Sequence, residues 1–274
     1  MNSAERKHKA AHTATLIFAG GLILLFLIFI TVPLVSLFTR IGIEDMATAL
    51  TSQTAIDALL LSATTATVST IIVVIFGTPL AYINARIPYK GRNIVDTITD
   101  LPIVLPPTVA GLALLLAFGT NGLIGQYLYL GFGIRIAFTT VAVIIAQIFV
   151  ASPFYIRQAR SSFEAVDVDL EHASRTLGAG IFKTFVKVTL PIASGSLLSG
   201  IIMTFARALG EFGATMMFAG NLAGKTQTMP LAIYSVLQSD MSVSIALAII
   251  LVVFSFGIIL IVKYIGSREG KKYV

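Results

Sequence analysis

Residues 171–191 read EHASRTLGAGIFKTFVKVTLP and form the most informative part of the sequence. They belong to a polar stretch, about residues 157–190, that separates two long apolar stretches. Gly178 lies where a helical pattern stops and a left-handed backbone is needed. Pro191 then opens the next apolar stretch. The segment therefore predicts a short helix, a glycine turn and a second helix that enters a membrane.

The short helix before the glycine has a start signal and one apolar face. Asp167 or Asp169 is placed to cap it, and Glu171 in its first turn has Arg175 four residues further on. The apolar face consists of Leu170, Ala173 and Leu177, and a second one after the turn consists of Ile181, Phe182, Phe185 and Val188. A short amphipathic helix of this kind suits a groove on a soluble partner or the lipid headgroups, and the pattern alone leaves both open.

The composition places the whole chain in a membrane. Of 274 residues, 56% are hydrophobic and only 12% are charged, about half the roughly 25% of soluble domains. The mean hydropathy is +0.91. These values exclude a soluble enzyme. The sequence has no cysteine, and its three histidines, His8, His12 and His172, lie outside the apolar stretches, so we expect no metal site and no catalytic residue in the membrane.

The long apolar stretches predict six membrane-spanning helices, since a span needs about 20 mostly apolar residues. They are expected at about residues 14–38, 57–85, 98–118, 137–157, 191–218 and 241–264. The first has a basic leader but is too long for a signal peptide and lacks a cleavage site, so it is read as an uncleaved span. The expected fold class is an all-α integral membrane protein, with residues 1–274 as one domain.

The positive charges predict the orientation. Fifteen of the 19 Lys and Arg residues fall in both tails and in the two loops that follow residues 57–85 and 137–157. The opposite side has only Arg40, Arg135 and Lys225. Because Lys and Arg accumulate on the cytoplasmic side, we expect both termini to be cytoplasmic in a multi-pass protein of the cell membrane. This topology accounts for the net charge of +6, and nucleic-acid binding is excluded.

Two segments are candidates for the pathway or gate. The first is DLPIVLPPTVAG at residues 100–111, where Pro106 and Pro107 precede Thr108 and bend the helix. A broken helix in a membrane either lines a cavity or packs in protein, and both readings stand. The second contains Arg207 and Glu211, which are four residues apart and can pair. They form either an electrostatic element beside the pathway or an ion pair that fixes the helix.

Hydroxyl side chains are concentrated in the apolar stretch at residues 57–85. They are Ser62, Thr64, Thr65, Thr67, Ser69 and Thr70. A tetrahedral dianion that crosses a membrane needs hydrogen-bond donors along its path, which these residues offer. Hydroxyls are equally common at contacts between membrane helices, so the two readings are left open.

The polar segment resembles the signature of ABC importer permeases, which runs Glu-Ala-Ala, three residues, Gly, nine residues, Ile, any residue and Leu-Pro. Here Glu171-His172-Ala173, Gly178 and Val188-Thr189-Leu190-Pro191 stand at the same spacing, with His172 for Ala and Val188 for Ile. The resemblance implies a type I importer fold of six spans. It also implies that Glu171, His172, Ala173 and Gly178 form a coupling helix for a cytoplasmic ATPase. Glu171 would orient the loop or pair with a basic residue of that ATPase.

The segments at residues 100–111 and 207–234 resemble the molybdate and tungstate permeases, which are related to the sulfate permeases. The resemblance implies a homodimer of this permease, two cytoplasmic ATPase subunits and an extracytoplasmic oxyanion-binding protein. The chain has no GxxxxGK[ST] phosphate loop, so we expect it not to be an enzyme by itself, to carry no cofactor and to leave ATP and Mg²⁺ to the ATPase. The alternatives are a sulfate or thiosulfate permease and an ion-coupled secondary transporter.

Overall fold

The computed structural model describes residues 3–270, except for the side chains of residues 3–11, 13, 14, 43, 45 and 265–270. Every regular element in this range is helical. In chain order these are α1 (Ser3–Thr39), α2 (Ile43–Thr51), α3 (Gln53–Arg86), α4 (Arg92–Val104), α5 (Pro107–Phe118), α6 (Gly125–Phe132), α7 (Thr140–Glu164), α8 (Val168–Thr176), α9 (Ile181–Thr184), the π-helical turn η1 (Phe185–Thr189), α10 (Leu190–Leu209), α11 (Gly213–Phe218), α12 (Met229–Leu237) and α13 (Met241–Gly270).

Five continuous helical stretches within residues 3–270 are long and apolar enough to cross a membrane. They are Thr15–Thr39, Gln53–Arg86, Thr140–Glu164, Ile181–Leu209 and Met241–Tyr264. The pair α4 and α5 makes a sixth crossing if it is counted as one broken span. The chain is therefore an all-α, multi-pass membrane protein.

Two of the predicted spans have the wrong shape. The span expected at residues 98–118 is two helices, α4 and α5, and the chain bends by 115° at the break between them. The span expected at residues 191–218 begins earlier, at Ile181, and ends at Leu209, so that α11 is a separate short helix. In both places proline or glycine interrupts the helix, because these residues are the poorest helix formers.

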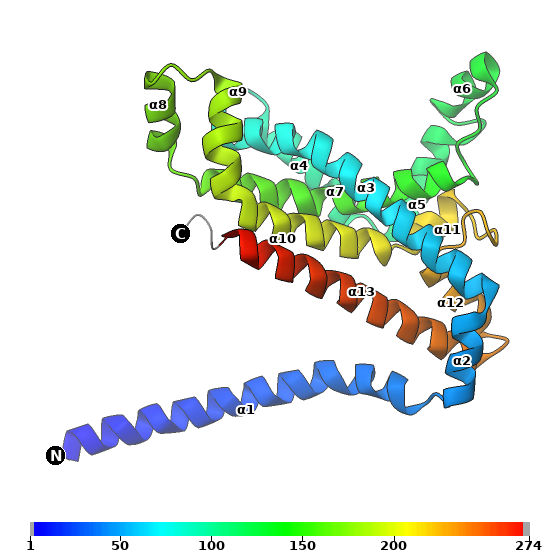
Figure 1. The fold of residues 1–274 in the computed structure, drawn as a ribbon, viewed down its shortest axis with the longest axis horizontal. Coiled ribbons are helices and arrows are strands. Elements are labelled where there is room, and N and C mark those ends of the chain that lie inside the picture. The colour runs from blue at the N-terminus through cyan, green and yellow to red at the C-terminus, as the bar shows by residue number, and fades with distance from the viewer. Residues whose placement is uncertain (1–2, 271–274) are drawn as a thin grey trace.

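The centre of the molecule is a bundle of α3, α7 and α10 (Figure 1). Alanines allow these helices to approach closely, as is usual in membranes. Ala66, Ala151 and Ala208, one from each helix, share a cluster in which all three are fully buried. Nearer to α8 the contact is made by larger side chains, among them Tyr155 and Phe163 of α7. The bundle forms the frame on which the other elements are placed.

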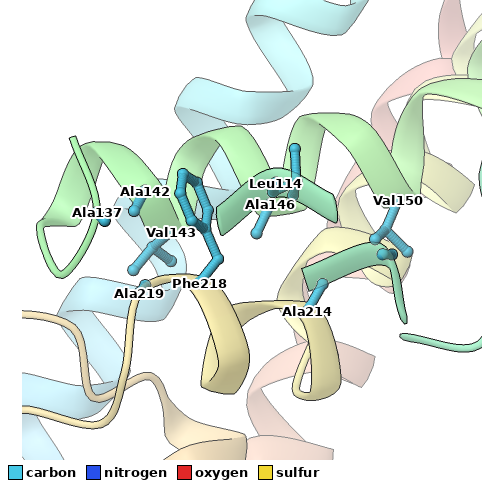
Figure 2. Close-up of a cluster of buried hydrophobic side chains, with 10 residues drawn as sticks. Leu114, Ala137, Ala142, Val143, Ala146, Val150, Ala214, Phe218 and Ala219 are labelled. Atoms are coloured by element: carbon cyan, nitrogen blue, oxygen red, sulfur yellow. The ribbon is translucent and has the colours of Figure 1, made fainter. Parts of the chain in front are cut away.

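A second buried cluster joins α7 to the short helices α5 and α11. Figure 2 shows the Phe218 ring, which is fully buried, pointing from α11 towards α7. Leu114 of α5 and Ala214 of α11 belong to the same cluster. The two short helices therefore pack on the frame as well as on each other.

Ion pairs bind α4 to α7. Arg160 of α7 lies 2.6 Å from Asp96 and 2.9 Å from Glu164, and Arg92 lies 3.1 Å from Glu164. The same end of the bundle carries α8, whereas α1 starts far from it (Figure 1). Along most of its length α1 lies apart from the bundle, and its apolar stretch is exposed. The basic side chains Arg6, Lys7, Lys9, Arg268, Lys271 and Lys272, which contributed to the predicted orientation, lie outside the described side chains.

Candidate functional site

The short helix α8 forms because both of its ends are capped. Asp167 Oδ1 accepts a hydrogen bond of 2.9 Å from the amide of Asp169, so Asp167 is the N-cap of the two candidates. At the other end Gly178 has a φ of +85°. The amides of Gly178 and Ala179 donate to carbonyls of the last turn, in the pattern of a Schellman end. The predicted helix and its glycine turn are both present.

Glu171 is the inward-facing residue of α8 and is only 2% exposed. Its Oε1 lies 3.1 Å from Nε of Arg86, the last residue of α3, and accepts a hydrogen bond of 2.7 Å from Thr189 Oγ1. The Tyr82 hydroxyl donates to Oε2 at 3.4 Å. The ion-pair partner of Glu171 is therefore Arg86 rather than Arg175, which stands four residues further on in the sequence. Of the two roles that the resemblance implied for Glu171, the geometry supports orienting the loop.

The opposite face of α8 is uncovered. Ala173 lies about 160° around the helix from Glu171, at 100° per residue, and is exposed together with His172. Leu170 is 47% exposed and Leu177 is 89% exposed. The apolar face predicted from the sequence therefore points away from the rest of this chain, next to the exposed Gly178.

The second predicted apolar face, after the glycine turn, is only partly correct. Ile181 and Phe182 are exposed, and the buried residues of this stretch are Thr184 and Thr189. These threonines face inward because each has a polar partner there. Thr184 Oγ1 lies 3.1 Å from Ser174 Oγ of α8, and Thr189 bonds to Glu171.

A π-helical turn, η1, lies where this stretch becomes α10. The amide of Leu190 donates to the carbonyl of Phe185, five residues earlier. The Phe185 ring packs against the rings of Tyr82 and Phe163. Single π turns inside α-helices are frequent at functional sites, and this one adjoins the Glu171 carboxylate through Thr189.

The proline-rich candidate lies at the break between α4 and α5. Pro106 precedes α5 and Pro107 is its first residue, a position where proline costs no hydrogen bond. Pro106, Pro107 and Thr108 are all exposed in the single chain. The predicted bend is present, and at 115° it is a sharp turn of the chain rather than a kink.

The charged candidate lies at the break between α10 and α11. Arg207 Nη1 is 2.7 Å from Glu211 Oε2, so the predicted pair forms, but Glu211 lies in the link between α10 and α11 rather than on the same helix as Arg207. Glu211 Oε1 also accepts a hydrogen bond of 2.8 Å from the amide of Ala214 in α11. The Glu211 side chain is 1% exposed and that of Arg207 is 30% exposed. This geometry supports the reading of an ion pair that fixes the helix.

The two breaks lie against each other, a contact that the sequence did not predict. A Cβ on Gly213, next to the Glu211 break, would be 2.6 Å from Pro107 Cβ. A Cβ on Gly111 of α5 would be 2.6 Å from Met217 Cβ and 2.7 Å from the Ala214 carbonyl of α11. Only glycine fits at these points. The two segments predicted separately as gate candidates therefore adjoin, where α5 and α11 pack against each other.

The hydroxyl row on α3 is divided between the two readings. Ser62, Thr65 and Ser69 are buried at helix contacts. Ser69 donates to Gln147 of α7 at 3.0 Å, Gln147 donates to Thr65 at 3.2 Å, and Ser62 accepts from the amide of Met229 at 2.7 Å. Thr70 is also buried and bonds within its own helix, whereas Thr64 and Thr67 are exposed. The reading as helix contacts therefore accounts for Ser62, Thr65 and Ser69.

Sequence reasoning missed three residues that hold these sites together. Arg86 was counted only as a basic loop residue, and Thr189 stands at the unspecified position of the signature. Gln147 is a lone amide in an apolar stretch, which is a signal for a helix contact. No group of three or more His, Asp or Glu side chains in the described part of the chain is placed to hold a metal ion.

Solved structures with this fold define a class of protein. The chain matches a bacterial ABC transporter involved in the import of the acidic polysaccharide alginate, with a TM-score of 0.74 and 18% identity over 96% of this chain and 99% of that chain. It matches the MetNI methionine ABC transporter in an inward-facing conformation with a TM-score of 0.61 and 17% identity, over 80% and 95% of the two chains. The fold is that of type I ABC importer permeases.

The chain belongs to the family of binding-protein-dependent transport system inner membrane components, whose sequence pattern matches residues 77–271. It is 41% identical over 240 residues to the probable transport system permease protein NifC of Clostridium pasteurianum, covering 87% of this chain and 84% of NifC. It is 40% identical over 244 residues to the molybdenum transport system permease protein ModB of Mycobacterium tuberculosis, covering 88% and 90%. These matches confirm the resemblance to ABC importer permeases found at residues 171–191. They also confirm the resemblance to molybdate permeases found at residues 100–111 and 207–234.

Proposed function

We propose that this chain is the membrane-spanning subunit of an ATP-driven molybdate importer. Two copies would form the translocation pathway, and α8 would couple it to a separate ATPase. The observation that carries the coupling role is the division of α8 into a buried side held by Glu171 and an uncovered side formed by Leu170, Ala173 and Leu177. The relatives named as molybdenum transport permeases support the choice of substrate.

The uncovered side of α8 is suited to a groove on a soluble protein. Leu177, the C-cap of α8, is 89% exposed and adjoins the exposed Leu170 and Ala173 on one side of this amphipathic helix. An amphipathic helix with its back held in place loses little freedom when its front is buried, which favours binding. The alternative of lipid headgroups is less suited to α8, because its hydrophobic face is only three residues wide.

The partners follow from this reading. The distribution of Lys and Arg supports a cytoplasmic position for α8 and both termini. Two ATPase subunits would bind there with ATP and Mg²⁺, and an oxyanion-binding protein would deliver molybdate to the opposite face. Tungstate, a dianion of the same tetrahedral shape, would use the same pathway.

The ion pairs of this structure support an ATP-driven importer over an ion-coupled carrier. A carrier needs titratable groups within the membrane that bind and release the coupling ion. The residues available for this were Arg207, Glu211 and Asp100. Arg207 and Glu211 pair with each other, and Asp100 pairs with Arg157. A sulfate or thiosulfate importer is the alternative within the same class. It differs from a molybdate importer only in its substrate.

The test is ATP hydrolysis by the reconstituted complex. The permease, its ATPase and the binding protein are placed in liposomes, and hydrolysis is measured with molybdate, tungstate and sulfate. We expect molybdate and tungstate to stimulate hydrolysis and sulfate to have no effect. Stimulation by sulfate alone would mean that the substrate is sulfate rather than molybdate. Uptake by the permease alone, driven by an ion gradient, would overturn the proposed class.

A matched pair of variants tests the docking face. Leu177→Asp places a charge on the apolar face of α8, and we expect at least a tenfold loss of ATPase binding. Thr176→Asp adds the same charge at the neighbouring position of the last turn, off that face, and serves as the control. Equal loss in both variants would assign the effect to charge at the helix end and would count against docking through the apolar face.

A further inference from the structure

We propose that Glu171 is a positioning residue that transmits the movement of α8 to the membrane-spanning helices. Its carboxylate ties α8 to the end of α3 through Arg86 and to the start of α10 through Thr189. The inference rests on the proposed function, because it assumes that the ATPase moves α8. It assigns Glu171 to this chain's own interior rather than to the surface that the ATPase contacts.

Glu171 is the only buried residue among the nine residues of α8. The chain leaves α8 through Gly178-Ala179-Gly180, a turn with little side chain to resist bending. Beyond Glu171, a polar contact between α8 and the following helix is made by Ser174 and Thr184, whose hydroxyls lie 3.1 Å apart. A force applied to the outer face of α8 therefore reaches the end of α3 and the start of α10 through the Glu171 carboxylate, beside the backbone link of residues 165–167 that joins α8 to α7.

The partners of this carboxylate lie at the ends of two helices of the central bundle. Arg86 is the last residue of α3, and its Nη2 also donates a hydrogen bond of 2.7 Å to the Val166 carbonyl, just before α8. Thr189 is the last residue of η1, directly before α10. A rigid helix carries displacement along its axis, so α10 connects this end to the break at Glu211, beside which α5 and α11 pack against each other.

The surroundings make the tie strong and specific. The Arg86 side chain is 11% exposed and that of Glu171 is 3% exposed. Loss of either partner leaves the other charge buried without compensation, which is costly. The rings of Tyr82, Phe163 and Phe185 pack beside the pair. Thr189 lies in the π turn η1, a departure from regular α-helical hydrogen bonding that is frequent at functional sites.

The tie is first tested in the permease alone by a distance measurement. The chain has no cysteine, so spin labels on Thr176→Cys in α8 and Lys90→Cys after α3 are unique. We expect a narrow distance distribution that becomes at least twice as wide in Glu171→Gln and narrows again in the charge-reversed double variant Arg86→Glu/Glu171→Arg. Asp169→Asn, which removes an exposed carboxylate from the same helix, is the control. An unchanged distribution in Glu171→Gln would overturn the inference.

The transmission is tested in the reconstituted complex with the ATPase and the binding protein. In Glu171→Gln we expect the ATPase still to co-purify, though less tightly because α8 is no longer held in place, while stimulation by molybdate-loaded binding protein, measured per bound ATPase, falls at least tenfold. In the charge-reversed variant Arg86→Glu/Glu171→Arg we expect part of this stimulation to return. Thr189→Val, which keeps the ion pair and removes one hydrogen bond, serves if Glu171→Gln does not fold, with a smaller loss expected.

The outcomes separate the inference from the proposed function. If the unaltered permease does not bind the ATPase, the proposed function fails, whatever the labels show. If it binds and Glu171→Gln abolishes binding, Glu171 is a docking residue and the inference is wrong. If binding and stimulation are both retained in Glu171→Gln, the coupling runs through other contacts and the inference is also wrong.

Discussion

At the scale of single residues, the coupling segment depends on a backbone conformation as much as on side chains. Gly178 has a φ of +85° and allows the last carbonyls of α8 to be satisfied. Any side chain at this position strains the left-handed backbone by roughly 1–2 kcal/mol. Gly180, two residues later, has a φ of −68° and open space around it. Only Gly178 is therefore required for its backbone conformation, whereas Gly180 can be replaced by alanine without strain.

We predict that Gly178→Ala reduces ATPase co-purification and that Gly180→Ala leaves it unchanged. The first variant frays the end of α8 and misplaces Leu177, whereas alanine is compatible with the backbone at residue 180. The measurement is the amount of ATPase retained on immobilised permease. A similar reduction in both variants would mean that the turn needs flexibility rather than a left-handed residue.

Gly111 illustrates a second use of glycine, the close approach of two helices. We predict that Gly111→Ala destabilises the permease by about 1–3 kcal/mol, because overpacking forces α5 and α11 apart. The measurement is the denaturation midpoint of the purified protein in detergent. Gly131→Ala in α6, where nothing lies within 4 Å of the added carbon, is the control and should leave the midpoint unchanged.

At the scale of elements, polar side chains specify how α3 and α7 are paired. Gln147 bonds to Ser69 and Thr65, and all three side chains are buried where α3 meets α7. Such interhelical hydrogen bonds contribute roughly 0.6–1.7 kcal/mol in membranes. They therefore fix the register of the two helices more than they stabilise the fold.

We predict that Gln147→Leu lowers stability by about 1 kcal/mol, within the range for interhelical hydrogen bonds, and broadens the conformations sampled by α3. The loss is measured as a shift of the denaturation midpoint. Gln238→Leu, at an exposed position after α12, provides the comparison. A larger shift in Gln238→Leu than in Gln147→Leu would contradict a role for the buried amide.

The elements also show what the sequence could and could not predict. The long apolar stretches, the cap at Asp167 and the turn at Gly178 were predictable, because each depends on neighbouring residues. The partner of Glu171 was not, because Arg86 is 85 residues away and an arginine after a span has an obvious role as a topology signal. The crossing of α5 and α11 was missed for the same reason, since nothing local links Gly111 to Met217.

At the scale of the whole molecule, the helices should divide the loops between two sides of the membrane. We predict that Thr176→Cys reacts with a membrane-impermeant maleimide only from the cytoplasmic side, and Lys225→Cys only from the outer side. Both positions are exposed, and the chain has no other cysteine. Reaction of both cysteines from one side would contradict the orientation predicted from the basic residues.

The separation of Arg86 and Glu171 along the chain has a consequence for biosynthesis. At 5–20 residues per second, a ribosome takes roughly 4–17 s to add the 85 residues between them. During that interval Arg86 is already at the membrane surface while its carboxylate has yet to be made. The nascent chain must therefore keep this arginine hydrated, and the coupling segment can be completed only after α7 has been inserted.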